Sequence, residues 1–179
     1  WMKVRPSRAS ISCAWRAASA SVSPSTTTSA PSTCVLCSLV FGVPRGITTD
    51  IAVQRAGGET PDYFHATLRY ARLRVILHAS TMMAANDLRF SVHGTHGSFV
   101  KQGLDAQEDA LKAGRTPGDA GWGQDTRPGT LTSVDGERTS TQVIQGEPGD
   151  YRRYYAAISD AIRGDGANPV PAGEAIAVM

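Results

Sequence analysis

Two runs of alternating apolar and polar residues stand almost back to back in residues 63–80. The apolar positions are Phe64, Ala66, Leu68, Tyr70, Leu73, Val75, Leu77 and Ala79. A period of two puts one set of side chains on one face of a β-strand. A turn at Ala71-Arg72 sets Leu68 opposite Val75, so the segment predicts an antiparallel hairpin with one apolar face.

The same pattern recurs along the rest of the chain. Strands are expected over residues 47–53, 88–93 and 98–102, and Asp135-Gly136 marks a type I′ hairpin in residues 130–145. Asp105 and Asp150 are expected to cap two helices that end at Gly114 and Gly164. Another helix opens at Pro171 and still runs at Met179, so we expect the domain to be truncated at its C-terminus. The order predicts an α+β fold: a mostly antiparallel open sheet with helices on one face, preceded by a disordered N-terminal arm.

Residues 1–40 contrast with this pattern and are expected to form a low-complexity arm. Residues 1–49 carry five basic residues and no acids, whereas residues 50–179 carry 13 basic residues and 16 acids. No helical or alternating periodicity is visible in runs such as RAASASVSPSTTTSAPST. The arm fits a transit peptide, a linker whose upstream domain is missing, or, the preferred interpretation, a stretch translated out of frame.

The cysteines lie only in the first 37 residues. Cys34 and Cys37 form a single CxxC, without the second pair that a structural zinc site requires. No disulfide is therefore expected in residues 41–179, which fits a cytoplasmic protein. No run of 18 apolar residues is present that would cross a membrane.

The stretch HGTHGSFVKQGLDAQEDALKAG leaves three interpretations open. His93 and His96 could bind a metal, but the spacing supplies no third ligand. Gly94 and Gly97 could hold a phosphate, but a strand follows where a phosphate site needs a helix N-terminus. Strand, turn, strand and helix is the favoured interpretation, with no metal site. No GxGxxG or GxxxxGK[ST] motif occurs in the chain, and the acidic balance of its ordered part disfavours nucleic acid.

This stretch resembles the HGTRGSFxKxGLDPQExxLKxG segment of the Gfo/Idh/MocA oxidoreductase family. The runs FGVPRGITTDIAVQR, DYFHATLRYARLRVILHAS, GWGQDTRPGTLT and GDYRRYYAAISDAIRGDGANPVPAGEAIAVM extend the resemblance over residues 41–179. It implies the C-terminal α/β domain of an NAD(P)-dependent oxidoreductase that acts on a sugar, polyol or related compound. That domain supplies the substrate wall and, through its open sheet, the contact of a homo-oligomer.

Departures from the family limit what the resemblance transfers. The Gly-rich cofactor loop, the Glu-Lys-Pro segment and the Gly-x-His-x-x-Asp helix expected before Phe41 are missing, so no catalytic or cofactor-binding residue is assigned. NAD or NADP is expected in the full-length enzyme, with none bound to this fragment, which alone is expected to be inactive. Lys101, Gln107 and Trp122 are the candidate substrate-side residues. The alternative is a non-catalytic module that self-associates through its sheet or binds a small sugar.

Overall fold

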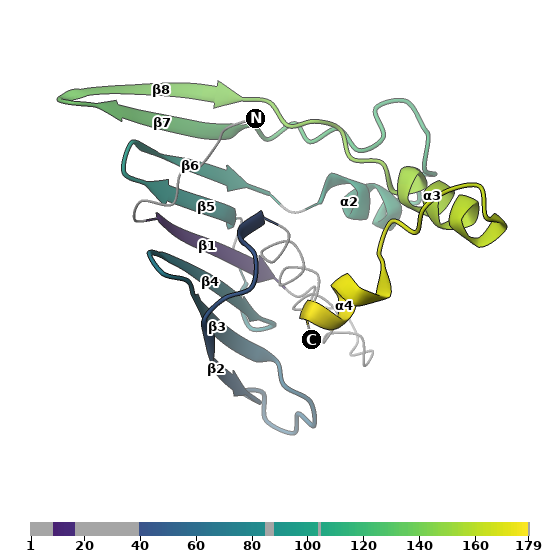
Figure 1. Cartoon of the computed structure of the whole chain (residues 1–179), viewed down its shortest axis with the longest axis horizontal. Coiled ribbons are helices and arrows are strands. Elements are labelled where there is room, and N and C mark those ends of the chain that lie inside the picture. Colours follow the sequence, from purple (N-terminus) through teal and green to yellow (C-terminus); the bar gives the residue numbers. More distant parts are fainter. Residues whose placement is uncertain (1–8, 17–39, 85–87, 104, 179) are drawn as a thin grey trace.

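One eight-stranded sheet organises the chain in a computed structural model that describes residues 9–16, 40–84, 88–103 and 105–178 (Figure 1). The strand order is β2-β3-β4-β1-β5-β6-β7-β8. Among the described pairs, only β1 with β4 is parallel. The strands are β1 (Ala9–Arg16), β2 (Gly46–Ala52), β3 (Tyr63–Arg69), β4 (Leu73–Ser80), β5 (Leu88–Gly94), β6 (Gly97–Gln102), β7 (Gly129–Asp135) and β8 (Arg138–Ile144).

The helices lie toward the end of the sheet at which β6 and β8 finish (Figure 1). They are α2 (Ala106–Lys112), α3 (Tyr151–Arg163) and α4 (Ala172–Val178). Asp105 caps α2 and Asp150 caps α3, each carboxylate accepting a hydrogen bond from the backbone N–H two residues on. Gly164 ends α3 in the left-handed conformation that glycine adopts without strain. The predicted α+β class is confirmed.

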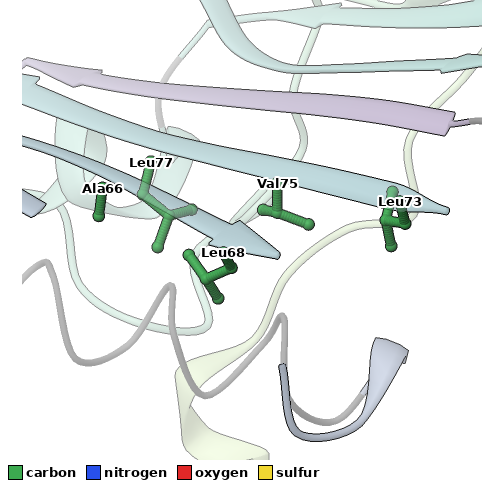
Figure 2. Close-up of a cluster of buried hydrophobic side chains, with 5 residues drawn as sticks. All are labelled: Ala66, Leu68, Leu73, Val75 and Leu77. Atoms are coloured by element: carbon green, nitrogen blue, oxygen red, sulfur yellow. The ribbon is translucent and has the colours of Figure 1, made fainter. Parts of the chain in front are cut away.

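The β3–β4 hairpin has the register that alternation predicts. Leu68 lies opposite Val75, and Ala66 opposite Leu77. These side chains and Leu73 form the buried cluster, with Val75 fully buried and Leu77 1% exposed. Figure 2 shows the five of them projecting from β3 and β4 toward the same side of the sheet. The apolar face of this hairpin is therefore the centre of the core.

The strand β1 differs from the sequence prediction of a disordered arm over residues 1–40. Ala9–Arg16 lies between β4 and β5, with Ile11 in register with Val75 on one side and Val92 on the other. Pairing in a sheet uses backbone N–H and C=O groups, so two neighbouring strands can recruit a segment whose own pattern is weak. The prediction is thus wrong for residues 9–16, while residues 1–8 and 17–39, with the CxxC of Cys34 and Cys37, lie outside the described part.

Candidate functional site

The carboxyl end of β6 carries the first candidate residue, Lys101. Its ammonium group donates to three oxygens: Asp125 Oδ2 at 2.6 Å, the Gln102 carbonyl at 2.9 Å and the Arg127 carbonyl. Three donors are all that an ammonium group has. The lysine side chain is 9% exposed and that of Asp125 11%. Lys101 therefore ties the end of β6 to the 114–129 loop.

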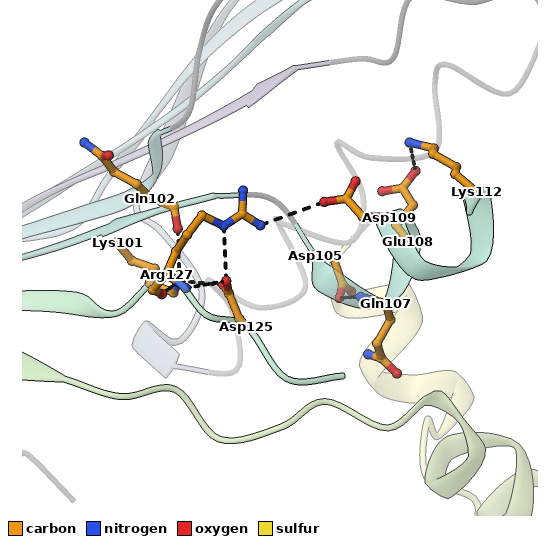
Figure 3. A network of polar contacts seen from close by, with 9 residues as sticks. All are labelled: Lys101, Gln102, Asp105, Gln107, Glu108, Asp109, Lys112, Asp125 and Arg127. Carbon is orange, nitrogen blue, oxygen red and sulfur yellow. Dashed lines mark hydrogen bonds and ion pairs between the residues drawn. The ribbon is translucent and has the colours of Figure 1, made fainter. Parts of the chain in front are cut away.

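Asp125 is held as a carboxylate by this arrangement (Figure 3). Burial alone opposes its ionisation, but hydrogen bonds from the Lys101 ammonium, and from the Arg127 backbone and side chain, outweigh burial and lower the pKa of Asp125 to about 2. The Arg127 guanidinium Nη2 also lies 3.9 Å from Asp109 Oδ2 of α2. The network thus links β6, the 114–129 loop and α2 by charge.

Gln107 is the second candidate and sits in the first turn of α2, 4% exposed. Its side-chain oxygen accepts two hydrogen bonds, from Trp122 Nε1 at 3.0 Å and from the backbone N–H of Tyr151 at 2.8 Å. Trp122, the third candidate, is 7% exposed. One buried amide therefore joins three segments: α2, the 114–129 loop and the start of α3.

A second contact reinforces the junction of α2 and α3. Asp105 accepts the Gln107 N–H with one carboxylate oxygen, and the hydroxyl of Tyr151 donates to the other. Burial, followed by this bond to Asp105, raises the pKa of Tyr151 well above its usual range. The phenol therefore stays protonated and keeps its donor role at physiological pH.

The structure brings the three candidates into two adjacent clusters. Gln107 and Trp122 are in direct contact, whereas Lys101 belongs to the Asp125 network, and the 114–129 loop contributes to both. All three side chains are directed into the chain itself, so they hold the loop in place rather than project into solvent. The sequence missed Asp125 and Tyr151 as partners, because nothing in a one-dimensional pattern indicates which acid meets a lysine 24 residues away.

The histidine pair of the turn is accounted for by local structure. His93 Nδ1 lies 2.8 Å from Ser98 Oγ across the β5–β6 hairpin. A Cβ on Gly97 would lie 2.2 Å from the Thr132 carbonyl oxygen, so this glycine accommodates β7 and not a phosphate. The strand, turn, strand and helix interpretation is confirmed. In the described residues no group of three His, Cys, Asp or Glu side chains is placed to hold a metal.

Replacing Gln107 with leucine is expected to lower the free energy of unfolding by about 2–4 kcal/mol. The change keeps the volume but leaves two buried N–H donors, on Trp122 and Tyr151, without an acceptor, at about 1–3 kcal/mol each. Urea unfolding measures the loss. The matched test is the double variant Gln107→Leu with Trp122→Phe, in which the Trp122 donor is also gone, so its loss should be smaller than the sum of the two single losses. Additive losses would contradict the role of the acceptor.

Comparison with known proteins identifies the family to which this chain belongs. The model of the oxidoreductase family's C-terminal alpha/beta domain matches residues 4–179. The chain therefore belongs to the Gfo/Idh/MocA oxidoreductase family and is its C-terminal α/β domain. No helix of the described residues is long and apolar enough to cross a membrane.

Individual relatives agree with this assignment. The chain is 50% identical over 140 residues to the oxidoreductase YdgJ of Escherichia coli, and 43% identical over 142 residues to the scyllo-inositol 2-dehydrogenase (NADP(+)) IolW of Bacillus subtilis. Each match covers 78% of this chain and 40% of the relative, so the chain spans well under half of their length. The solved structure of YvaA from Bacillus subtilis superposes with a TM-score of 0.85 at 35% identity, over 96% of this chain and 52% of YvaA.

Proposed function

We propose that this chain is the substrate and self-association domain of an NAD(P)-dependent oxidoreductase acting on a sugar, polyol or related compound in the cytoplasm. The observation that carries the proposal is the family match over residues 4–179, together with the likeness to IolW, whose name states a polyol substrate and NADP(+). The three buried candidates supply the structural part of the role. Lys101, Gln107 and Trp122 act as positioning residues that fix the 114–129 loop at the end of the sheet.

The nucleotide belongs, in this proposal, to the part of the longer relatives that this chain does not match. The Gly94–Gly97 turn leads into β6, and the space beside Gly97 is taken by β7, so this turn does not fit a dinucleotide phosphate. When bound, the nicotinamide supplies the hydride chemistry. The residues of this chain orient the substrate by holding the loop rigidly, because a poorly fixed wall reduces the fraction of substrate in a reactive position.

A second copy of the chain is the partner proposed for the sheet face opposite the core. That face of β3 and β4 carries half-buried side chains: Tyr63, His65, Thr67, Ile76 and His78. His65 and His78 face each other across the strands with ring centroids 5.6 Å apart. Burial and the neighbouring His65 lower the pKa of His78. A lowered pKa favours the uncharged form of the His78 imidazole, which suits a face that would pack against its copy.

Activity transfer tests the proposed function. In full-length IolW, the stretch matched by this chain is replaced by the corresponding residues within 41–179, and NADP+ reduction with scyllo-inositol is followed at 340 nm, the nicotinamide absorbance. Because 43% of the aligned residues are identical, we expect the chimera to fold and retain polyol-dependent activity. A folded chimera that binds NADP+ but oxidises no polyol, with an inositol and sugar panel tested, would contradict the proposed substrate role.

A further inference from the structure

The helix α3 carries an apolar stripe that the described chain leaves uncovered. No residue of α3 is buried. Tyr155 is 69% exposed and Ile162 81% exposed, and Tyr154 is 48% exposed. With Ile158, these positions fall within roughly 100° around the helix at 3.6 residues per turn. An amphipathic helix normally buries such a stripe against another element, so α3 is shaped for a contact that the described residues do not supply.

The base of α3 is held firmly even though its stripe is free. Gln107 accepts the N–H of Tyr151, and Asp105 accepts its hydroxyl. Asp150 caps the helix and pairs with Arg152 at 2.8 Å. The helix therefore projects from the Gln107–Trp122 cluster in a fixed direction, away from the sheet (Figure 1). A rigid, Tyr-rich apolar surface is typical of a protein interface.

The lengths of the relatives indicate what covers this stripe. The chain spans 40% of YdgJ and of IolW and 52% of YvaA, so each of these proteins contains a further body of comparable size or larger. A second copy is the competing occupant, but the sheet offers it a separate face bearing Tyr63, Ile76 and His78, at a different place from α3.

We propose that the stripe of Tyr154, Tyr155, Ile158 and Ile162 docks against the nucleotide-binding part of the longer protein. This inference rests on the proposed function, which places such a part beside this domain. Docking on α3 acts directly on the substrate wall, because Tyr151 at the helix start and Trp122 in the 114–129 loop share the single acceptor oxygen of Gln107. The stripe is thus the surface through which contact with the nucleotide-binding body affects the position of the 114–129 loop.

The test uses the IolW chimera with Tyr155→Ser and Ile162→Ser combined. Arg153→Ser, on the opposite side of the same helix, is the control. We expect the unsubstituted chimera and the control to unfold calorimetrically in one transition that NADP+ raises. The double variant should show two unfolding transitions, and NADP+ should raise the Tm of only one of them. Its kcat/KM for scyllo-inositol should be at least tenfold lower. In the free 179-residue chain the same double substitution should move Tm by less than about 2 °C, because both side chains are exposed.

Three outcomes would overturn the docking proposal. One is an active double-variant chimera that still unfolds in a single NADP+-raised transition. Another is a large loss of stability in the free chain, which would mean that the stripe packs within it. The third is a lower mass, measured by light scattering, for the free chain with the double substitution than for the free unsubstituted chain. Such a fall would mean that a second copy occupies the stripe. Failure of the unsubstituted chimera to oxidise any polyol would instead remove the proposed function itself, and the docking inference with it.

Discussion

Replacing Lys101 with methionine is expected to lower the free energy of unfolding by about 3 kcal/mol, since removing one partner of a buried ion pair leaves a buried charge without compensation. Asp125 would retain only the Arg127 contacts, at 3.0 and 3.1 Å, and two backbone carbonyls would lose their donor. Methionine preserves most of the aliphatic volume, so the loss reports the charge and its hydrogen bonds. Urea unfolding at pH 7 measures it.

Matched substitutions separate this effect from general damage. Lys112→Met removes a lysine that pairs with Glu108 at 3.1 Å on the exposed face of α2, and should cost no more than about 0.5 kcal/mol. The double variant Lys101→Met with Asp125→Leu should be closer to wild type than Lys101→Met alone, because an apolar pair needs no compensating charge. Equal losses for Lys101→Met and Lys112→Met would contradict the buried pair.

The same pair predicts a dependence of stability on pH. The pKa of Asp125 is about 2 in the folded chain, against 3.8 for an ordinary aspartate, so the folded chain binds this proton less tightly than the unfolded chain does. Such a group makes its full contribution to the free energy of unfolding above pH 3.8. That contribution, about 2 kcal/mol, is lost as the pH falls toward 2. Lys101→Met should therefore flatten the stability profile between about pH 4 and pH 2, as measured by urea unfolding across that range.

The substitution Gly123→Ala is expected to lower the free energy of unfolding by about 2–4 kcal/mol. Gly123 has φ +71°, a conformation that costs an L-residue about 1–2 kcal/mol. An added Cβ would also lie 1.8 Å from the Gly149 carbonyl oxygen, and the backbone shift that relieves this would break the 3.1 Å bond from Gly149 N–H to the Gly123 carbonyl. This hydrogen bond holds the 114–129 loop against the segment that leads into α3.

Gly121→Ala is the control for the conformational part of that effect. Gly121 has nearly the same φ, +74°, but an added Cβ would meet only the Gln124 side chain at an ordinary 3.6 Å. Gly121→Ala should therefore lower the free energy of unfolding by only about 1–2 kcal/mol, from backbone strain alone. Thermal unfolding of both variants, followed by circular dichroism, gives the difference. Equal Tm losses would mean that the close approach of the two loops is absent.

Much of the fold could be predicted because local pattern and tertiary environment agree. Alternation in residues 63–80 fixed which side chains meet across the hairpin, and Asp105, Asp150 and Gly164 marked helix ends by local hydrogen bonding and backbone conformation. The strand β1 could not be predicted from its own residues. Its place depends on pairing with β4 and β5, which lie more than 55 residues further along the chain.

The site was predictable only in part, for a related reason. Resemblance pointed to Lys101, Gln107 and Trp122 one at a time, and the substrate-side role remains a prediction. A solvated position for Gln107 on its helix would have been an equally simple interpretation, yet it is buried because Gly149 leaves it space: an added Cβ there would lie 2.6 Å from its side-chain nitrogen. No pattern in the neighbouring sequence indicates which distant side chain will pack against a given glycine.

One kinetic comparison tests the central claim most directly, namely that this domain forms the substrate wall while the nucleotide binds elsewhere. In the active IolW chimera, Trp122→Phe keeps an aromatic ring but removes the Nε1 donor to Gln107, which loosens the 114–129 loop. We expect the KM for scyllo-inositol to rise at least fivefold while the KM for NADP+ stays within twofold. A rise in the KM for NADP+ with an unchanged KM for scyllo-inositol would contradict the account.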